Sequence, residues 1–172
     1  MSISTITARF GGVSLAAALL LGPGVTWADS PHFISATDKI DTTTGDLTVS
    51  FKEAGLGSGT TVTYTLEADF SGACVCVTKS GTCPSAANKF TNQLATTSGT
   101  FTSGKSGNIT GSLTFTAACP PSNSPTCGGG QTLTLQSVSY SNITLSDNLT
   151  PENTVEPTPT APSTGNLFTC KQ

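Results

Sequence analysis

Apolar and polar side chains alternate without a break from Thr61 to Phe70, and a repeat of two fits a β-strand with one buried face. The apolar phase consists of Val62, Tyr64, Leu66, Ala68 and Phe70. The polar phase consists of Thr61, Thr63, Thr65, Glu67 and Asp69. This pattern predicts a strand whose apolar side chains, Leu66 among them, enter a core.

The same repeat recurs on both sides of this segment, at Leu47, Val49 and Phe51 and at Ile109, Gly111, Leu113, Phe115 and Ala117. Clusters of Gly, Ser and Pro separate the runs, and 32 Thr and 21 Ser favour pleated, half-solvated faces. We predict one all-β domain over residues 29–150. It should be a two-layer antiparallel β-sandwich of about seven to nine strands, immunoglobulin-like in architecture and disulfide-bonded.

The charge content excludes several classes of protein. Ten acidic residues against seven basic ones give a formal net charge of −3, and only 10% of the residues are charged. A nucleic-acid binder needs a basic face to neutralise phosphates, so no nucleic-acid partner is expected. A coiled coil would be rich in Glu, Lys and Leu, and it is excluded on the same ground.

Residues 1–28 are expected to be a secretory signal peptide. Arg9 supplies a positive charge, residues 13–21 form an apolar run, and Thr26-Trp27-Ala28 offers a small-residue cleavage site. The run is about nine residues long, whereas a membrane-spanning helix needs about 20. Cleavage after Ala28 would release a secreted, extracellular protein that begins at Asp29 and carries no membrane anchor.

Residues 151–172 are expected to form a Pro/Thr-rich C-terminal tail that ends near Cys170. This composition predicts an extended, mobile segment and, in a eukaryote, an acceptor for O-glycans. Asn108, Asn142 and Asn148 each begin an N-x-Thr pattern, so they are N-glycosylation candidates if the source is eukaryotic.

The apolar phase changes twice within residues 131–147. Leu133 and Leu135 are odd-numbered, Val138 and Tyr140 are even-numbered, and Ile143 and Leu145 are odd-numbered again. A change of phase turns the following side chains to the other face unless the strand bulges or breaks. We therefore predict irregularities near residues 136–137 and 141–142.

Candidate catalytic residues are few. His32 is the only histidine, so a serine-hydrolase triad or a copper site with two histidines has no complete set of side chains. Glu67 and Asp69 share one strand face about 6.5–7 Å apart. That separation suits an inverting glycoside hydrolase, but the neighbours are threonines, which favours a solvated outer face.

Metal and cofactor binding are not predicted. Asp38, Asp41 and Asp46 lie close together in the sequence, but the D-x-D-x-D-G spacing of a calcium loop is missing. A zinc site would need paired C-x2-C spacings or more than one histidine.

Four other side chains could contribute to recognition. Tyr64 and Tyr140 occupy apolar phases, so they are expected in the core rather than stacked on a sugar. Lys52 and Glu53 precede a glycine-rich turn and are expected to be strand-end charges in water.

Six cysteines follow the predicted cleavage point, which implies three disulfides in an oxidising compartment. Cys74 and Cys76 point the same way from one strand with Cβ atoms about 7 Å apart, too far for a disulfide. Cys83 lies beyond the short turn at residues 79–82 and is expected to pair with Cys74.

Several short motifs resemble those of a set of small secreted microbial β-sandwich proteins. They are Phe51-Lys52-Glu53-Ala54-Gly55-Leu56-Gly57, Cys76-Val77, Ala87-Asn88-Lys89, Gly130-Gln131-Thr132 and Val138-Ser139-Tyr140. The likeness covers most of residues 31–147 and implies the architecture but no activity. It also implies a Cys76–Cys127 disulfide, which leaves Cys119 for Cys170. A competing arrangement pairs Cys119 with Cys127 and Cys76 with Cys170.

The sequence therefore predicts a secreted, non-enzymatic binding or surface-interaction module whose partner is an unknown extracellular protein or glycan. Two alternatives come from other classes. One is a carboxylate-dependent glycan hydrolase that uses Glu67 and Asp69, and the other is a structural component of a wall or matrix.

Overall fold

The computed structural model describes residues 30–149, 153–159 and 164–171, so the expected signal peptide lies outside the described residues. These described residues form nine strands and one short 3-10 turn. They are β1 (His32–Ile40), β2 (Leu47–Ala54), β3 (Thr61–Thr78), β4 (Asn88–Thr102), β5 (Ile109–Phe115), η1 (Pro121–Asn123), β6 (Gln131–Asp147), β7 (Thr154–Val155), β8 (Thr158–Pro159) and β9 (Thr164–Asn166). The prediction of an all-β, disulfide-bonded sandwich is confirmed.

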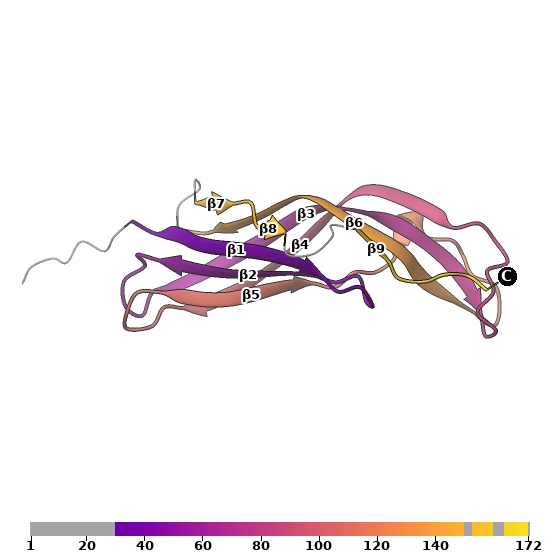
Figure 1. Cartoon of the computed structure of the whole chain (residues 1–172), viewed down its shortest axis with the longest axis horizontal. Coiled ribbons are helices and arrows are strands. Elements are labelled where there is room, and N and C mark those ends of the chain that lie inside the picture. Colours follow the sequence, from indigo (N-terminus) through magenta and orange to yellow (C-terminus); the bar gives the residue numbers. More distant parts are fainter. Residues whose placement is uncertain (1–29, 150–152, 160–163, 172) are drawn as a thin grey trace, which may run out of the picture.

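The strands form two sheets. The first sheet has the order β5-β2-β1-β8, and the second has the order β4-β3-β6-β7, with β9 also paired to β6. The molecule is elongated because β3, β4 and β6 run along most of its length, whereas β1, β2 and β5 lie over one part of it (Figure 1).

The apolar phases face the space between the sheets. Val62, Tyr64, Leu66, Ala68 and Phe70 are all buried, and Leu66 is only 1% exposed. Phe115 is half-buried, and its ring contacts the rings of Phe70 and Tyr140 with centroids 5.6 and 6.2 Å apart. The predicted face of β3 is confirmed, and Phe115 packs against the margin of the same core.

Both predicted irregularities of β6 are present. Gln136 is an extra residue of β6, since Ser137 lies opposite Ala73 and Leu135 lies opposite the next residue of β3. Farther along β6, two residues, Asn142 and Ile143, lie opposite the single residue Ala68. Asn142 adopts a left-handed φ of 51°, a conformation that Asn tolerates better than most residues. The two bulges return the apolar side chains of β6 to the core after each change of phase.

The C-terminal tail, which its composition predicts to be extended, forms short strand pairings in its described residues. Its described residues pair first with β6 through β7, then with β1 through β8, and again with β6 through β9. The backbone N–H groups of Leu167 and Phe168 then donate to the carbonyl of Gln136 at 2.8 and 3.2 Å. The tail therefore joins the two sheets along the side where β1 faces β6.

One expected disulfide is present and two differ. The structure joins Cys76 to Cys127, as the resemblance implies, but Cys74 pairs with Cys119 and Cys83 pairs with Cys170. The expected Cys74–Cys83 and Cys119–Cys170 pairs are therefore wrong.

The register of β3 and β4 explains the difference. β3 continues to Thr78, whose N–H donates to the carbonyl of Thr82, so the turn lies beyond Cys74 and the strand facing it begins only at Asn88. Asn88, not Cys83, is the residue opposite Cys74. The connection between β5 and β6 instead supplies partners to both cysteines of β3, and the turn after β3 meets the C-terminal end of the tail.

Candidate functional site

Hydroxyl groups dominate the outer faces of both sheets. In the second sheet, cross-strand hydroxyl pairs join Thr61 to Thr102 at 3.2 Å and Thr63 to Thr100 at 3.1 Å. In the first sheet, Thr48 and Thr114 form the same kind of pair at 3.0 Å. Because strand side chains alternate between faces, each apolar phase in the core leaves such a polar phase outside.

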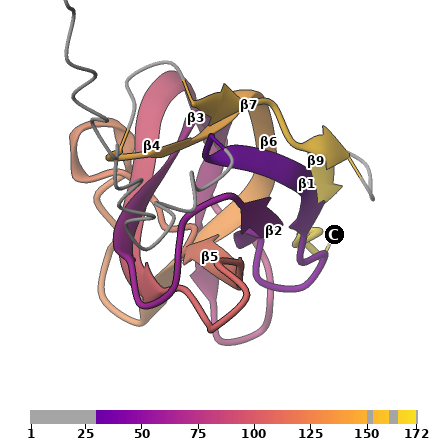
Figure 2. The ribbon, with the colours of Figure 1, turned by 90° about the vertical axis from the view of Figure 1, so that its left-hand side faces the viewer.

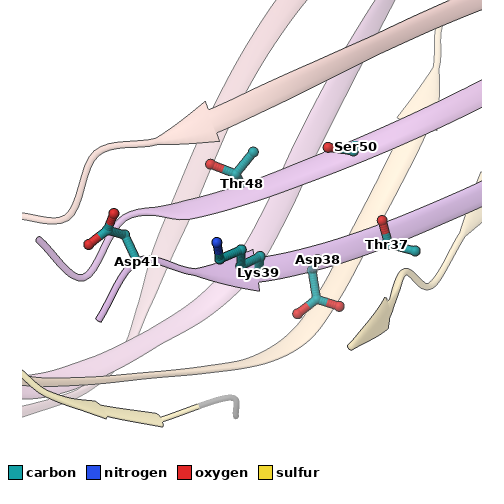
Figure 3. Close-up of a pocket in the computed structure, with 6 residues that line it drawn as sticks. All are labelled: Thr37, Asp38, Lys39, Asp41, Thr48 and Ser50. Carbon is teal, nitrogen blue, oxygen red and sulfur yellow. The ribbon is translucent and has the colours of Figure 1, made fainter. Parts of the chain in front are cut away.

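A shallow hollow of about 350 Å³ lies over β1 and β2, lined by Thr37, Asp38, Lys39, Asp41, Thr48 and Ser50. Register places Lys39 beside Thr48 and Thr37 beside Ser50, so these four side chains form a compact polar group on one sheet face. Figure 3 shows Lys39 and Thr48 on the same side of the ribbon, whereas the side chain of Asp38 projects from the opposite side.

One positive and one negative side chain, Lys39 and Asp41, lie among the residues that line the hollow. The backbone N–H groups of Thr44 and Thr43 donate to the Asp41 carboxylate, which lowers the pKa of Asp41 below its usual value, and Lys39 adds to this effect. Asp41 is therefore an ionised acceptor at neutral pH. With the nearby Thr and Ser hydroxyls and the Lys39 ammonium, the hollow offers both hydrogen-bond donors and acceptors.

Glu67 and Asp69, the predicted carboxylate pair, lie on the outer face of β3. Glu67 is exposed between Thr96 of β4 and Thr144 of β6, and Asp69 is half-exposed. The carboxylate of Asp69 accepts a 2.6 Å hydrogen bond from the Asn142 side chain. The general acid of a glycoside hydrolase usually lies in a shielded pocket, whereas Glu67 lies on an open sheet face.

Glu53 overturns one expectation, because it is fully buried rather than in water. Its carboxylate accepts hydrogen bonds from the Tyr64 hydroxyl at 2.5 Å and from the Asn153 side chain at 2.8 Å. Asn153 also donates to the buried carboxylate of Asp147. Burial raises the pKa of Glu53, and Asp147 raises it further.

This cluster has a structural role. Its members come from β2, β3, the end of β6 and the residue before β7, so the hydrogen bonds join both sheets and the tail. A sequence signal did exist, since Glu53 continues the odd-numbered phase of Leu47, Val49 and Phe51.

Asp38 is a second buried acid that sequence reasoning missed. It is only 1% exposed and shares the even-numbered phase of Ala36 and Ile40 on β1. It lines a cleft of about 320 Å³ together with residues of the β6 bulge and of the tail. Burial raises the pKa of Asp38.

The three aspartates that lie close together in sequence have separate tasks. Asp38 points inward, Asp41 caps its turn, and Asp46 accepts a 2.9 Å hydrogen bond from the backbone N–H of Ala117. Over residues 30–149, 153–159 and 164–171, no group of three or more His, Cys, Asp or Glu side chains is arranged to hold a metal ion.

The tyrosines lie in the core, as expected. Tyr140 donates a 2.9 Å hydrogen bond to the carbonyl of Gly45, and burial raises its pKa. Of the three glycosylation candidates, Asn142 and Asn148 are exposed and Asn108 is half-exposed. His32 is exposed at the start of β1.

Comparison with known proteins adds no relative: no family model, curated protein or solved structure matches the chain. In the part of the chain that the structure describes, no helix is long and apolar enough to cross a membrane. The site must therefore be interpreted from its own chemistry.

Proposed function

We propose that this protein is a secreted, non-enzymatic binding module that holds a neutral polysaccharide outside the cell through the hollow over β1 and β2. The observation that carries the proposal is the composition of that hollow. Hydroxyl groups from Thr37, Thr48 and Ser50 lie beside one ammonium and one carboxylate, so the surface can match the alternating donors and acceptors of a sugar chain.

Size and chemistry agree with a glycan more than with a protein partner. A hollow of about 350 Å³ falls in the lower part of the range for small-ligand sites, about 300–1,000 Å³. Protein interfaces concentrate their energy in buried aromatic and Arg anchors, and the six residues that line this hollow include neither. Near-cancellation of charge between Lys39 and Asp41 favours a neutral polymer over an anionic one.

Three disulfides support the extracellular setting, since such bonds persist in oxidising compartments. Secretion is tested by the intact mass of the exported protein. We expect a chain that starts at Asp29 and lacks Trp27, the only tryptophan. An exported chain that still contains Trp27 would contradict the proposed cleavage.

Binding is tested by retention of the exported protein on insoluble cellulose, chitin and β-1,3-glucan. We expect retention on at least one of them, and Thr48→Val with Ser50→Val should weaken it by roughly tenfold, since two hydrogen bonds are lost. Thr61→Val with Thr63→Val is the matched control, because it removes two hydroxyls from the outer face of the other sheet. Absence of retention, or equal loss in both variants, would contradict the proposal.

Two further outcomes separate the rival functions. Release of soluble sugar that stops with Glu67→Gln and Asp69→Asn would favour the hydrolase. Retention in the producer's wall that survives Thr48→Val with Ser50→Val would favour a structural component. Each outcome would overturn the binding proposal.

A further inference from the structure

Strand β4 forms one margin of the second sheet and carries a long free edge. Among the described residues it pairs only with β3, over Asn88–Thr102. Figure 2 shows β4 at the outer side of the sheet, with β3 next to it. In an edge strand, alternate residues point their N–H and C=O groups away from the sheet, so this edge offers hydrogen bonds to another strand.

The regular part of this edge lacks the two sequence features that most often protect an edge strand against such pairing. A bulge at Thr91–Asn92 interrupts the start of β4, where Asn92 has a φ of 50°, but Gln93–Thr102 pairs with β3 without a register shift. These ten residues contain no charge and no proline, the two features that natural edge strands use most against association.

The other margins differ from β4. β7 and β8 are each two residues long, and β8 contains Pro159. β5 is uncharged too, but it is only seven residues long. β4 therefore presents the longest regular edge among the described strands.

We propose that β4 pairs antiparallel with β4 of a second copy of this chain, so that two sheets join into one across a two-fold axis. Identical strands can always pair in this way, because each contact in one direction is repeated in the other. No like charges meet along Gln93–Thr102, and the net charge of −3 per chain opposes association weakly. This surface is separate from the hollow over β1 and β2, so the inference does not depend on the proposed function.

The side chains of the outer face fit this arrangement. With Ser98 on the axis, Thr96 lies opposite Thr100 of the second copy and Leu94 lies opposite Thr102 of the second copy. Hydroxyl pairs of this kind already join β3 to β4 within the chain. Leu94 is 69% exposed in the single chain, and the pairing covers part of its apolar side chain.

The test measures the mass of the exported, disulfide-intact protein in solution by sedimentation and light scattering across a wide concentration range. We expect a dimer that dissociates on dilution. Ser98→Lys with Thr100→Lys places four ammonium groups at the contact, so the dissociation constant should rise about a hundredfold. Both positions are exposed, so the monomer should keep its unfolding temperature.

Ser112→Lys with Thr114→Lys on β5 is the matched control and should leave the dimer intact. A wild-type chain that stays monomeric at every concentration overturns the proposal, and so does dissociation by the β5 variant alone or by both variants equally. Hydrogen exchange of the wild type gives a readout that needs no variant. Amides of Gln93–Thr102 should gain protection as concentration rises, and unchanged protection there would contradict the pairing.

Discussion

The hydroxyl of Tyr64 on β3 donates a 2.5 Å hydrogen bond to the carboxylate of Glu53 on β2, so a polar contact joins the two sheets inside the core. Both residues are fully buried. Asn153 donates to the other oxygen of Glu53 and to Asp147, which ties the start of the tail to the same point. A buried carboxylate is tolerated only when its oxygens have such partners.

Removal of the Tyr64 hydroxyl should therefore destabilise the fold. Tyr64→Phe leaves an oxygen of Glu53 without its donor, and the expected cost is about 1–3 kcal/mol of unfolding free energy. Thr48→Val is the matched control, since it removes a hydroxyl from an exposed pair and should cost less than about 0.5 kcal/mol. Denaturant titration measures both values. Equal costs would show that the buried contact contributes nothing beyond a surface one.

Stability should fall as pH rises, and Glu53 should cause part of the fall. Burial raises the pKa of Glu53 above its usual 4.5, so the folded state holds the proton more tightly than the unfolded state. The resulting stabilisation is complete below pH 4.5 and is lost as pH rises through the folded-state pKa. Asp38 acts in the same direction, since burial raises its pKa too.

The measurement is the free energy of unfolding of wild type and Glu53→Gln from pH about 4 to pH about 8. The Gln side chain cannot ionise, so the variant should lose less stability over this interval. Asp38→Asn should flatten part of the remaining slope. Parallel curves for wild type and Glu53→Gln would show that Glu53 does not titrate with folding.

Alternation alone was enough to predict β2, the first part of β3 and β5, together with the faces that they bury. Val62 to Phe70 lie as predicted because a repeat of two leaves only one face for the apolar set. The bulges at Gln136 and Asn142 were predictable for the same reason, since only an extra residue can correct a change of phase. In both cases the information lies within one short segment.

Contacts between distant segments were not predictable in this way. The partners of Glu53, the pairing of the tail and two of the three disulfides depend on which segments meet across the sandwich. Glu53 shows the limit most clearly: its phase points inward, but only Tyr64 and Asn153, 11 and 100 residues away, make burial of its charge acceptable. Composition alone does not reveal the short pairings of the tail or the disulfide partner of Cys170, because both depend on distant segments.

Leu66 and Phe115, which both occupy apolar phases of their strands, should differ in their cost on truncation. Leu66 is 1% exposed, so Leu66→Ala should cost about 2–5 kcal/mol, as for other buried leucines. Phe115 is half-buried at the margin of the core. Truncation of a fully buried Phe to Ala costs about 3–5 kcal/mol of unfolding free energy, and Phe115→Ala should cost less than that. Denaturant titration of the two variants gives the comparison. A larger loss for Phe115→Ala would mean that the margin is packed more tightly than the centre.

The Cys83–Cys170 disulfide should hold the far end of the tail in place. It closes the longest of the three loops, with a sequence separation of 87, for which loop entropy predicts a contribution of about 4.6 kcal/mol. Cys83→Ser with Cys170→Ser should therefore lower the free energy of unfolding and raise hydrogen exchange at residues 164–171, where β9 pairs with β6. Cys76→Ser with Cys127→Ser is the matched control, since its loop is shorter, with a sequence separation of 51, and includes no residue of the tail. Peptide mapping without reduction should link Cys83 to Cys170 and Cys74 to Cys119. A Cys74–Cys83 link, or unchanged exchange at residues 164–171 in the first variant, would contradict this anchoring of the tail.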